Sequence, residues 1–219
     1  MAAADNHRYP RVMPDAAPVS DDPTRDRLIE AAAAVFAEKG YDGAGVQEIA
    51  RRAGFTTGAI YGRFRGKAEL LLAAIEAHTT NELEQLFADH RFDGRVTDIL
   101  TTVGSHLLTD PFDDGQALLL EAFVAARRDP EVAELMRALV HQRAANLAAL
   151  VEDAKASGLV VEELDTESVV RFCHAVGFGF LLFGAIDLQP PQAGPWEQLI
   201  AQMVRALGQP VQGPPPAIS

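Results

Sequence analysis

Residues Val46–Lys67, which read VQEIARRAGFTTGAIYGRFRGK, decide the fold of this chain. The stretch holds two short helical patterns separated by a turn at Gly54, and a helix, a tight glycine-containing turn and a second helix form the unit that places its second helix in the major groove of DNA. It carries five of the nineteen Lys and Arg residues, with Glu48 as its only acid. In a 219-residue protein with a formal charge of −12, this local excess of positive charge favours DNA binding at one end.

Capping residues set the helix bounds around the turn. The first helix is predicted to begin near Asp22-Pro23, because Asp is a good N-cap and Pro is tolerated in the first turn, and to end at Gly40. The second begins at Val46, and Glu48 is expected to reach back to the N-cap N–H as half of a capping box. Thr56 or Thr57 should cap the third helix, which is predicted to run to about Phe64.

A longer motif surrounds this unit. It consists of Phe36, Gly40, Tyr41, Ile49, Ala50, Ala53, Gly54, Thr57, Gly58, Ala59, Ile60, Tyr61, Phe64, Lys67, Leu70 and Leu71. Together these residues resemble the N-terminal domain of the TetR family of transcriptional regulators, over roughly Arg25 to Ile75. The resemblance implies a helix-turn-helix DNA-binding domain followed by a larger ligand-binding and dimerising domain.

The second short helix carries the predicted DNA contacts. If it lies in the major groove, its early residues face base edges, where threonine hydroxyls hydrogen-bond and methyl groups touch thymine. The resemblance implies Thr57, Tyr61 and Lys67 as contacts. Gly62 replaces a usually larger residue of the family, which makes Arg63 a preferred candidate, and Gly45 replaces a usual Ser or Thr. The predicted DNA-contacting residues are Thr56, Thr57, Gly58, Ala59, Tyr61, Arg63 and Lys67.

Other residues of the stretch are expected to be structural. Apolar positions at helical spacing predict a core of Ile49, Ala53, Phe55, Ile60 and Phe64. Arg51 and Arg52 are interpreted as a solvated face or as remote phosphate contacts rather than base readers.

The rest of the chain predicts an all-α protein, because no segment alternates with period two between hairpin signals. Further helices are expected from 67 to about 87 and over 96–107, 116–128, 130–157, 166–187 and 195–207. The predicted domains are a disordered arm (1–21), the helix-turn-helix domain (22–67), an effector-binding and dimerisation domain (68–208) and a disordered tail (209–219). Acidic residues outnumber basic ones strongly after residue 67, so this larger part has the wrong charge for DNA.

The last two predicted helices favour a homodimer. The stretch VGFGFLLFGAI within 166–187 is apolar nearly all round, and 195–207 supplies a second apolar stripe. Packed against their symmetry mates, the two helices would form a four-helix interface; the alternative is an intramolecular core.

An effector pocket needs a few polar groups among apolar helices. Glu121 within LLLEAFV is the most pointed candidate, because a buried carboxylate needs a partner. The abundance of Phe, Leu and Ala favours a hydrophobic or aromatic effector. The predicted ligand-binding residues are His106, Glu121, Phe123, Asn146, Arg171, His174 and Phe178.

Several function classes are disfavoured. No run of about 18 uncharged apolar residues predicts a membrane span, and the N-terminus lacks the apolar region of a signal peptide, so a cytoplasmic protein is expected. Cys173 is the single cysteine of the sequence, so neither an intramolecular disulfide nor a Cys-rich zinc site is expected. The histidines lack metal-ligand spacing, and no catalytic or phosphate-binding motif is found, so no enzyme and no cofactor are expected.

The sequence thus predicts a homodimeric transcriptional regulator, a repressor that a small effector releases from a palindromic operator. One alternative is an activator or effector-independent regulator with the same fold. Another, from a different class, is a helical small-molecule-binding protein or enzyme in which the N-terminal helices are only structural.

Overall fold

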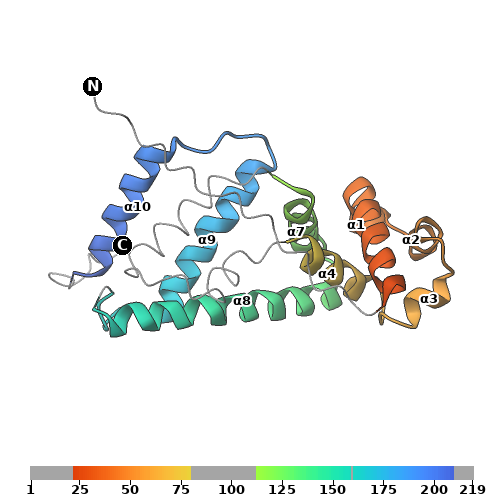
Figure 1. Ribbon diagram of the computed structural model, residues 1–219, viewed down its shortest axis with the longest axis horizontal. Coiled ribbons are helices and arrows are strands. Elements are labelled where there is room, and N and C mark those ends of the chain that lie inside the picture. Colours follow the sequence, from red (N-terminus) through yellow and green to blue (C-terminus); the bar gives the residue numbers. More distant parts are fainter. Residues whose placement is uncertain (1–21, 80–111, 159, 210–219) are drawn as a thin grey trace, which may run out of the picture.

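The computed structural model describes residues 22–79, 112–158 and 160–209 (Figure 1). All regular structure in these ranges is helical, which confirms the all-α prediction there. The helices are α1 (Pro23–Gly43), α2 (Val46–Ala53), α3 (Thr57–Tyr61), α4 (Lys67–His78), α7 (Asp114–Ala125), α8 (Pro130–Ala156), α9 (Thr166–Gly184) and α10 (Ala193–Leu207). The predicted arm (1–21), the linking helix beyond residue 79, the helix over 96–107 with His106, and the tail from residue 210 lie outside the described residues.

The long helix α8 runs along the molecule (Figure 1). At one end lie α1, α2 and α3; α4 and α7 follow, and α9 and α10 lie toward the other end. The positively charged stretch is therefore at one tip of an elongated protomer, remote from α9 and α10.

Aspartate caps begin four of the helices. Asp22 accepts hydrogen bonds from the backbone N–H groups of Thr24 and Arg25 at 3.0 and 3.2 Å, which confirms the predicted start of α1. Asp113, Asp129 and Asp165 cap α7, α8 and α9 in the same way. Because Asp113 caps α7, that helix begins two residues before the predicted Gln116, and it ends at Ala125 rather than residue 128.

Helical geometry in α1 is interrupted at Gly40, where φ is 68° and ψ is 173°. This is the left-handed side of backbone space, which glycine enters without the steric penalty of a Cβ. The prediction that Gly40 ends the helix therefore identifies the point of interruption, although one more turn follows to Gly43. The interruption places Tyr41 at a corner in the chain, in the last turn of α1.

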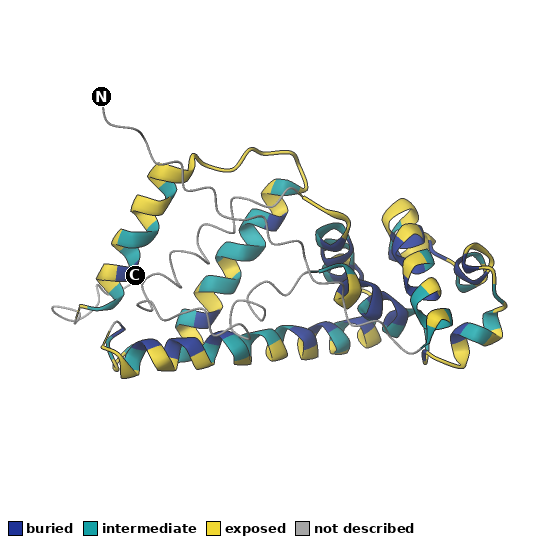
Figure 2. Cartoon of the chain, viewed as in Figure 1, coloured by how far each residue is buried: buried dark blue, intermediate teal, exposed yellow. Residues whose placement is uncertain are grey.

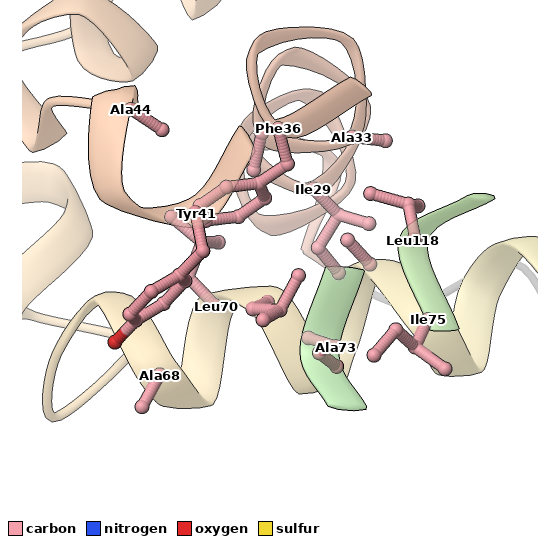
Figure 3. Packing of buried hydrophobic residues seen from close by; sticks show 14 of the residues in the cluster. Ile29, Ala33, Phe36, Tyr41, Ala44, Ala68, Leu70, Ala73, Ile75 and Leu118 are labelled. Atoms are coloured by element: carbon pink, nitrogen blue, oxygen red, sulfur yellow. The ribbon is translucent and has the colours of Figure 1, made fainter. Parts of the chain in front are cut away.

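One hydrophobic core joins the helices of the tip to those of the larger part (Figure 3). Phe36 of α1, Leu70 of α4 and Leu118 of α7 are all at most 1% exposed within it. The predicted core residues Ile49, Ala53, Ile60 and Phe64 are buried, and Phe55 packs half-buried against them, so this prediction is confirmed. A second, smaller cluster joins α8 to α9 through Leu147, Leu150, Val151 and Val170.

In contrast, α9 and α10 leave much apolar surface exposed (Figure 2). Only Val170 and Leu181 of α9 are buried, whereas Leu182 is 54% and Ile186, just beyond the helix, 72% exposed. No membrane span is expected from the sequence, yet α9 is long and apolar enough to cross a membrane by length and composition alone, with 11% of that stretch buried. A single helix of this kind is weak evidence for a membrane.

The backbones of α4 and α7 approach each other closely where α7 crosses α4. A Cβ added at Gly115 would lie 2.2 Å from the carbonyl oxygen and 2.6 Å from the carbonyl carbon of His78. Real contacts of this kind do not occur below about 3 Å, so only glycine fits here. The first turn of α7 is thereby set directly on the last turn of α4.

We expect Gly115→Ala to destabilise the protein by at least about 1–3 kcal/mol, the usual cost of overpacking, because both clashing groups are backbone. Thermal unfolding followed by circular dichroism measures the change. The control is Gly58→Ala, whose Cβ would meet only the Thr56 hydroxyl at 3.6 Å and which should leave the melting temperature unchanged or raised. Equal melting temperatures for the parent and Gly115→Ala would contradict the tight crossing.

Candidate nucleic-acid interface and effector region

The turn between α2 and α3 is fixed by backbone geometry. Gly54 is left-handed, with φ 78°, and its N–H donates to the Arg51 carbonyl at 3.2 Å. The N–H of Phe55 donates to the Ala50 carbonyl at 2.9 Å. This pair of bonds is the Schellman ending of a helix, which turns the chain sharply. The predicted helix-turn-helix unit is therefore present.

Helix α3 is shorter than the sequence predicts. It ends at Tyr61 rather than near Phe64, and the N–H groups of Arg63 and Phe64 continue as turn hydrogen bonds to the Ile60 carbonyl at 2.9 and 2.8 Å. Thr56 is the N-cap, but its side chain makes no capping hydrogen bond.

The outward face of α3 carries the predicted contacts. Tyr61 is 61% exposed, and Thr56 and Gly58 are also exposed. Thr57 and Ala59 are half-buried, whereas Ile60 points into the core. The helix thus presents hydroxyl, phenol and bare backbone groups outward.

Arg63 is held beside this face by the N-cap of α1. Its Nε lies 2.6 Å from Asp22 Oδ2, and its Nη2 lies 3.2 Å from Asp22 Oδ1. The hydrogen bond from Arg63 holds the pKa of the Asp22 carboxyl below its usual range. An anion that binds Arg63 must therefore compete with Asp22 for the guanidinium.

Lys67 has a structural role that the sequence does not reveal. Its ammonium donates to the carbonyls of Tyr41 at 2.8 Å and Ala44 at 3.3 Å, and it lies 4.1 Å from the centre of the Tyr41 ring. These contacts hold the start of α4 against the last turn of α1 and the residue that follows it. An ammonium has three donors, of which two are used by these carbonyls.

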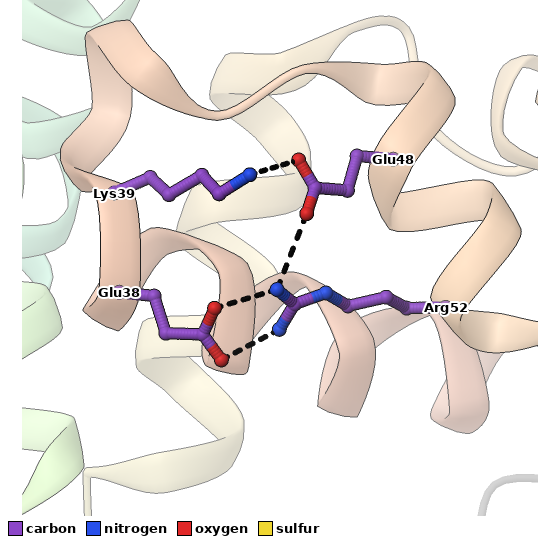
Figure 4. A network of polar contacts seen from close by, with 4 residues as sticks. All are labelled: Glu38, Lys39, Glu48 and Arg52. Atoms are coloured by element: carbon purple, nitrogen blue, oxygen red, sulfur yellow. Dashed lines mark hydrogen bonds and ion pairs between the residues drawn. The ribbon is translucent and has the colours of Figure 1, made fainter.

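An ion-pair network fixes α2 against α1 (Figure 4). Arg52 pairs with both oxygens of Glu38 at 2.6 and 2.5 Å and with Glu48 at 3.2 Å, and Lys39 pairs with Glu48 at 2.5 Å. Arg52 lowers the pKa of Glu38, and Lys39 lowers that of Glu48. The expected capping bond from Glu48 back to residue 45 is wrong, because α2 has no side-chain cap and the carboxylate binds these cations.

Three of the predicted effector residues lie together. The rings of Phe123 on α7 and Phe178 on α9 meet edge to face, with centroids 4.9 Å apart, and the His174 ring lies 6.0 Å from that of Phe178. Burial lowers the pKa of His174, and the positive charges of Arg143 and Arg171 lower it further. The cluster is an aromatic wall with a neutral imidazole at its edge near neutral pH.

Arg143 on α8 is a candidate effector-binding residue that is not among those predicted from the sequence. Its Nη2 lies 2.8 Å from the Thr79 hydroxyl, just beyond the end of α4. The signal was present in the sequence, because Arg143 lies four residues from both Leu139 and Leu147 and so shares their inward-facing side of α8. Asn146 is half-buried on the next turn.

Two predicted effector residues lie elsewhere. Arg171 is exposed and pairs with Glu167 one turn away at 3.0 Å. The Glu121 carboxylate accepts a 2.6 Å hydrogen bond from the backbone N–H of Tyr41, next to the interruption of α1 at Gly40. Both carboxylate and guanidinium therefore have protein partners outside the aromatic cluster, which favours structural roles for them over the predicted ligand contact.

Known proteins share this arrangement. Residues 28–74 match the family described as bacterial regulatory proteins, tetR family, and residues 93–200 match the tetracyclin repressor-like C-terminal domain. The chain belongs to the TetR family. Because the two matches cover both the helix-turn-helix end and the larger helical part, the TetR resemblance extends well beyond the residues that first indicated it.

Individual relatives from the TetR family match different lengths of this chain. The transcriptional activator FasR of Mycolicibacterium smegmatis is 43% identical over 60 residues, which are 27% of each protein. The transcriptional regulator UidR of Escherichia coli K12 is 25% identical over 163 residues, or 73% of this chain and 80% of UidR. The structure of Salmonella enterica GusR has a TM-score of 0.69 at 25% identity and covers 87% of this chain and 97% of GusR. The match to FasR spans only about a quarter of FasR, whereas those to UidR and GusR span both parts.

We expect Asp22→Asn to raise the affinity for DNA of any sequence about two- to fivefold, the range that corresponds to an exposed ion pair. Asparagine still caps α1 but no longer competes for Arg63. Fluorescence anisotropy with an unrelated duplex measures the change. Asp26→Asn, in the same first turn of α1, is the charge-matched control; an equal gain in both variants would assign the effect to net charge alone.

Proposed function

We propose that this TetR-family protein binds a palindromic DNA operator as a homodimer and regulates transcription, acting as a repressor that a small hydrophobic or aromatic effector releases. The observation that carries the proposal is the exposed face of α3, bordered by Arg63 and Lys67, at the tip of the protomer. DNA and the effector would both be met in the cytoplasm. Because the relative FasR is named a transcriptional activator, activation of transcription is the alternative to repression.

The proposed DNA contacts divide by chemistry. Thr56, Thr57, Gly58 and Ala59 would face base edges, where hydroxyl and methyl groups discriminate between bases. Tyr61, Arg63 and the remaining donor of Lys67 would bind phosphate oxygens, which position the protein without reading sequence. In a two-fold dimer, the half-sites would lie about one helical turn, roughly 34–36 Å, apart.

The proposed dimer uses α9 and α10. Their exposed apolar residues include Phe172, Leu182, Phe183 and Leu199, and Ile186 is exposed just beyond α9. Large apolar side chains exposed together on one part of a protein often mark a surface that a partner covers, and an identical copy offers the same surface in a two-fold interface. Such a dimer would cover the apolar, poorly buried surface of α9, so no membrane is needed to explain it.

The proposed effector region is the aromatic cluster of Phe123, His174 and Phe178, with Asn146 and Arg143 on the adjacent face of α8. An effector that prefers a protomer arrangement unsuited to DNA would lower the affinity for DNA. By thermodynamic linkage, DNA would then lower the affinity for the effector by the same factor. No enzymatic activity is proposed, because the family relatives carry the names of regulators.

A selection experiment tests the proposal. The full-length protein is incubated with a random duplex library, and bound duplexes are recovered, sequenced and re-tested by gel shift at two salt concentrations. The proposal expects an enriched inverted repeat and an affinity that falls steeply with salt. Failure to enrich any duplex would reject DNA binding and favour the helical small-molecule-binding alternative.

We expect Arg63→Ala to weaken binding to the enriched duplex and to lower the salt slope by about 1 per half-site, because one phosphate contact is lost. Arg52→Ala removes the same charge, but its guanidinium is engaged by Glu38 and Glu48, so it should leave the slope close to that of the parent. Binding isotherms at a series of salt concentrations measure both. Equal reductions in slope would remove Arg63 from the contact surface.

We expect Leu182→Asp to convert the dimer to a monomer of 23.6 kDa, because it places a charge in the proposed α9 interface. Light scattering after size-exclusion chromatography measures the mass. Val124→Asp, at another exposed apolar residue on α7, is the control that should remain dimeric. A dimeric Leu182→Asp protein would move the interface away from this face.

A further inference from the structure

We propose that Glu121 is a positioning residue for DNA binding: through the backbone N–H of Tyr41 it fixes the end of α1 to α7, and with it the helix-turn-helix unit that packs on α1. The inference rests on the proposed function, because its consequence is the orientation in which each protomer presents α3 to DNA. It gives Glu121 a role different from the ligand contact that the sequence predicts.

The first step is the shape of the corner. At Gly40 the backbone leaves helical geometry, so the next N–H group, that of Tyr41, is released from the regular hydrogen-bond ladder of α1. Glu121 Oε1 accepts this N–H at 2.6 Å. A Cβ at Gly40 would lie 3.0 Å from the same oxygen. The carboxylate therefore sits directly against the bare backbone of Gly40, and these two positions fit each other.

The second step is the number of elements that meet at Tyr41, which is only 4% exposed. Its hydroxyl donates to Asp129 Oδ2, at the N-cap of α8, at 2.8 Å. Its carbonyl accepts from Lys67, the first residue of α4, at 2.8 Å. With Glu121 on α7, three helices of the larger part thus hold one residue at the end of α1. On the surface beside it, Arg128 pairs with Asp42 at 2.9 Å.

The third step is what else α7 touches. Two residues beyond Glu121, Phe123 packs its ring on Phe178 of α9 in the proposed effector region. At the other end of α7, Gly115 lies against the last turn of α4. A displacement of α7 by an effector would therefore reach Tyr41 through the Glu121 hydrogen bond, while α4 is held at both of its ends. Helix α7 and the helix-turn-helix unit would then move together rather than slide past each other.

The test compares Glu121→Ala and Glu121→Gln with the parent and with Glu134→Ala, which removes an exposed carboxylate from α8. The DNA probes are the duplex that the parent enriches and two versions with the half-site spacing changed by one base pair in either direction. Hydrogen exchange of the Tyr41 amide reports the bond directly. Thermal unfolding and size-exclusion chromatography report folding and dimerisation.

We expect the Tyr41 amide to exchange faster in Glu121→Ala, and binding to the parental duplex to weaken about tenfold or more, the factor that corresponds to losing one hydrogen bond to a charged group. Binding to the altered spacings should weaken less, so that discrimination between spacings falls. Glu121→Gln keeps an acceptor oxygen and should lie between Glu121→Ala and the parent, and Glu134→Ala should match the parent.

Other outcomes overturn the inference. A purely structural role predicts that affinity falls by the same factor for all three spacings, in proportion to lost stability, and unchanged discrimination in Glu121→Ala or Glu121→Gln would establish it. If Glu121→Ala does not fold, Glu121→Gln alone decides between these results. If the parent itself enriches no duplex, the proposed function fails first, and a positioning role in DNA binding fails with it.

Discussion

The structure depends on burying one face each of α1, α4 and α7 in a single hydrophobic core. The tip that carries α2 and α3 is too small to bury much apolar surface alone, and small units are hard to stabilise without further packing. Here Phe36 and Ile60 of the tip share a core with Leu70 and Leu118. The helix-turn-helix unit is therefore packed against the larger part, and the hydrophobic core runs across the predicted domain boundary between residues 67 and 68.

Charge is arranged around this core so that three arginines of the tip have acidic partners. Arg52 pairs with Glu38, Arg63 with Asp22, and Arg65 with Glu69, whose carboxylate also accepts the Arg65 N–H at 2.6 Å. A phosphate must replace such a partner to gain the full interaction with the guanidinium. This exchange would lower the affinity for DNA of any sequence, so in the proposed complex discrimination between sequences would rest on the fit of α3 to base edges.

The features that could be predicted from sequence are those with local causes. The Asp22 carboxylate caps N–H groups two and three residues further on, and Gly54 turns the chain through its own backbone. The apolar residues Ile49 and Ile60 lie at positions that the helical spacing predicts to be buried. Long-range pairings were not predictable. Glu121 finds its partner 80 residues away at Tyr41, and Arg143 its partner 64 residues away at Thr79. The apolar neighbours of Glu121 and the helical spacing of Arg143 are consistent with inward-facing polar groups, but the path of the chain decides what each of them meets.

The exposure of α9 and α10 follows from the same core. Burial at the inner end of α9 is limited to residues such as Leu181 that reach α7, and the second cluster with α8 uses only one side of the helix. The remaining sides carry exposed apolar side chains such as Leu182 and Leu199, and no further element among the described residues of the elongated protomer covers them (Figure 2). Burial of such surface stabilises by roughly 25 cal/mol per Å², so a second copy that covers it would add stability and also set the distance between two α3 helices. Dimer packing at α9 and the anchoring of Tyr41 at the opposite end of the protomer would thus act on the same quantity, the spacing that DNA must match.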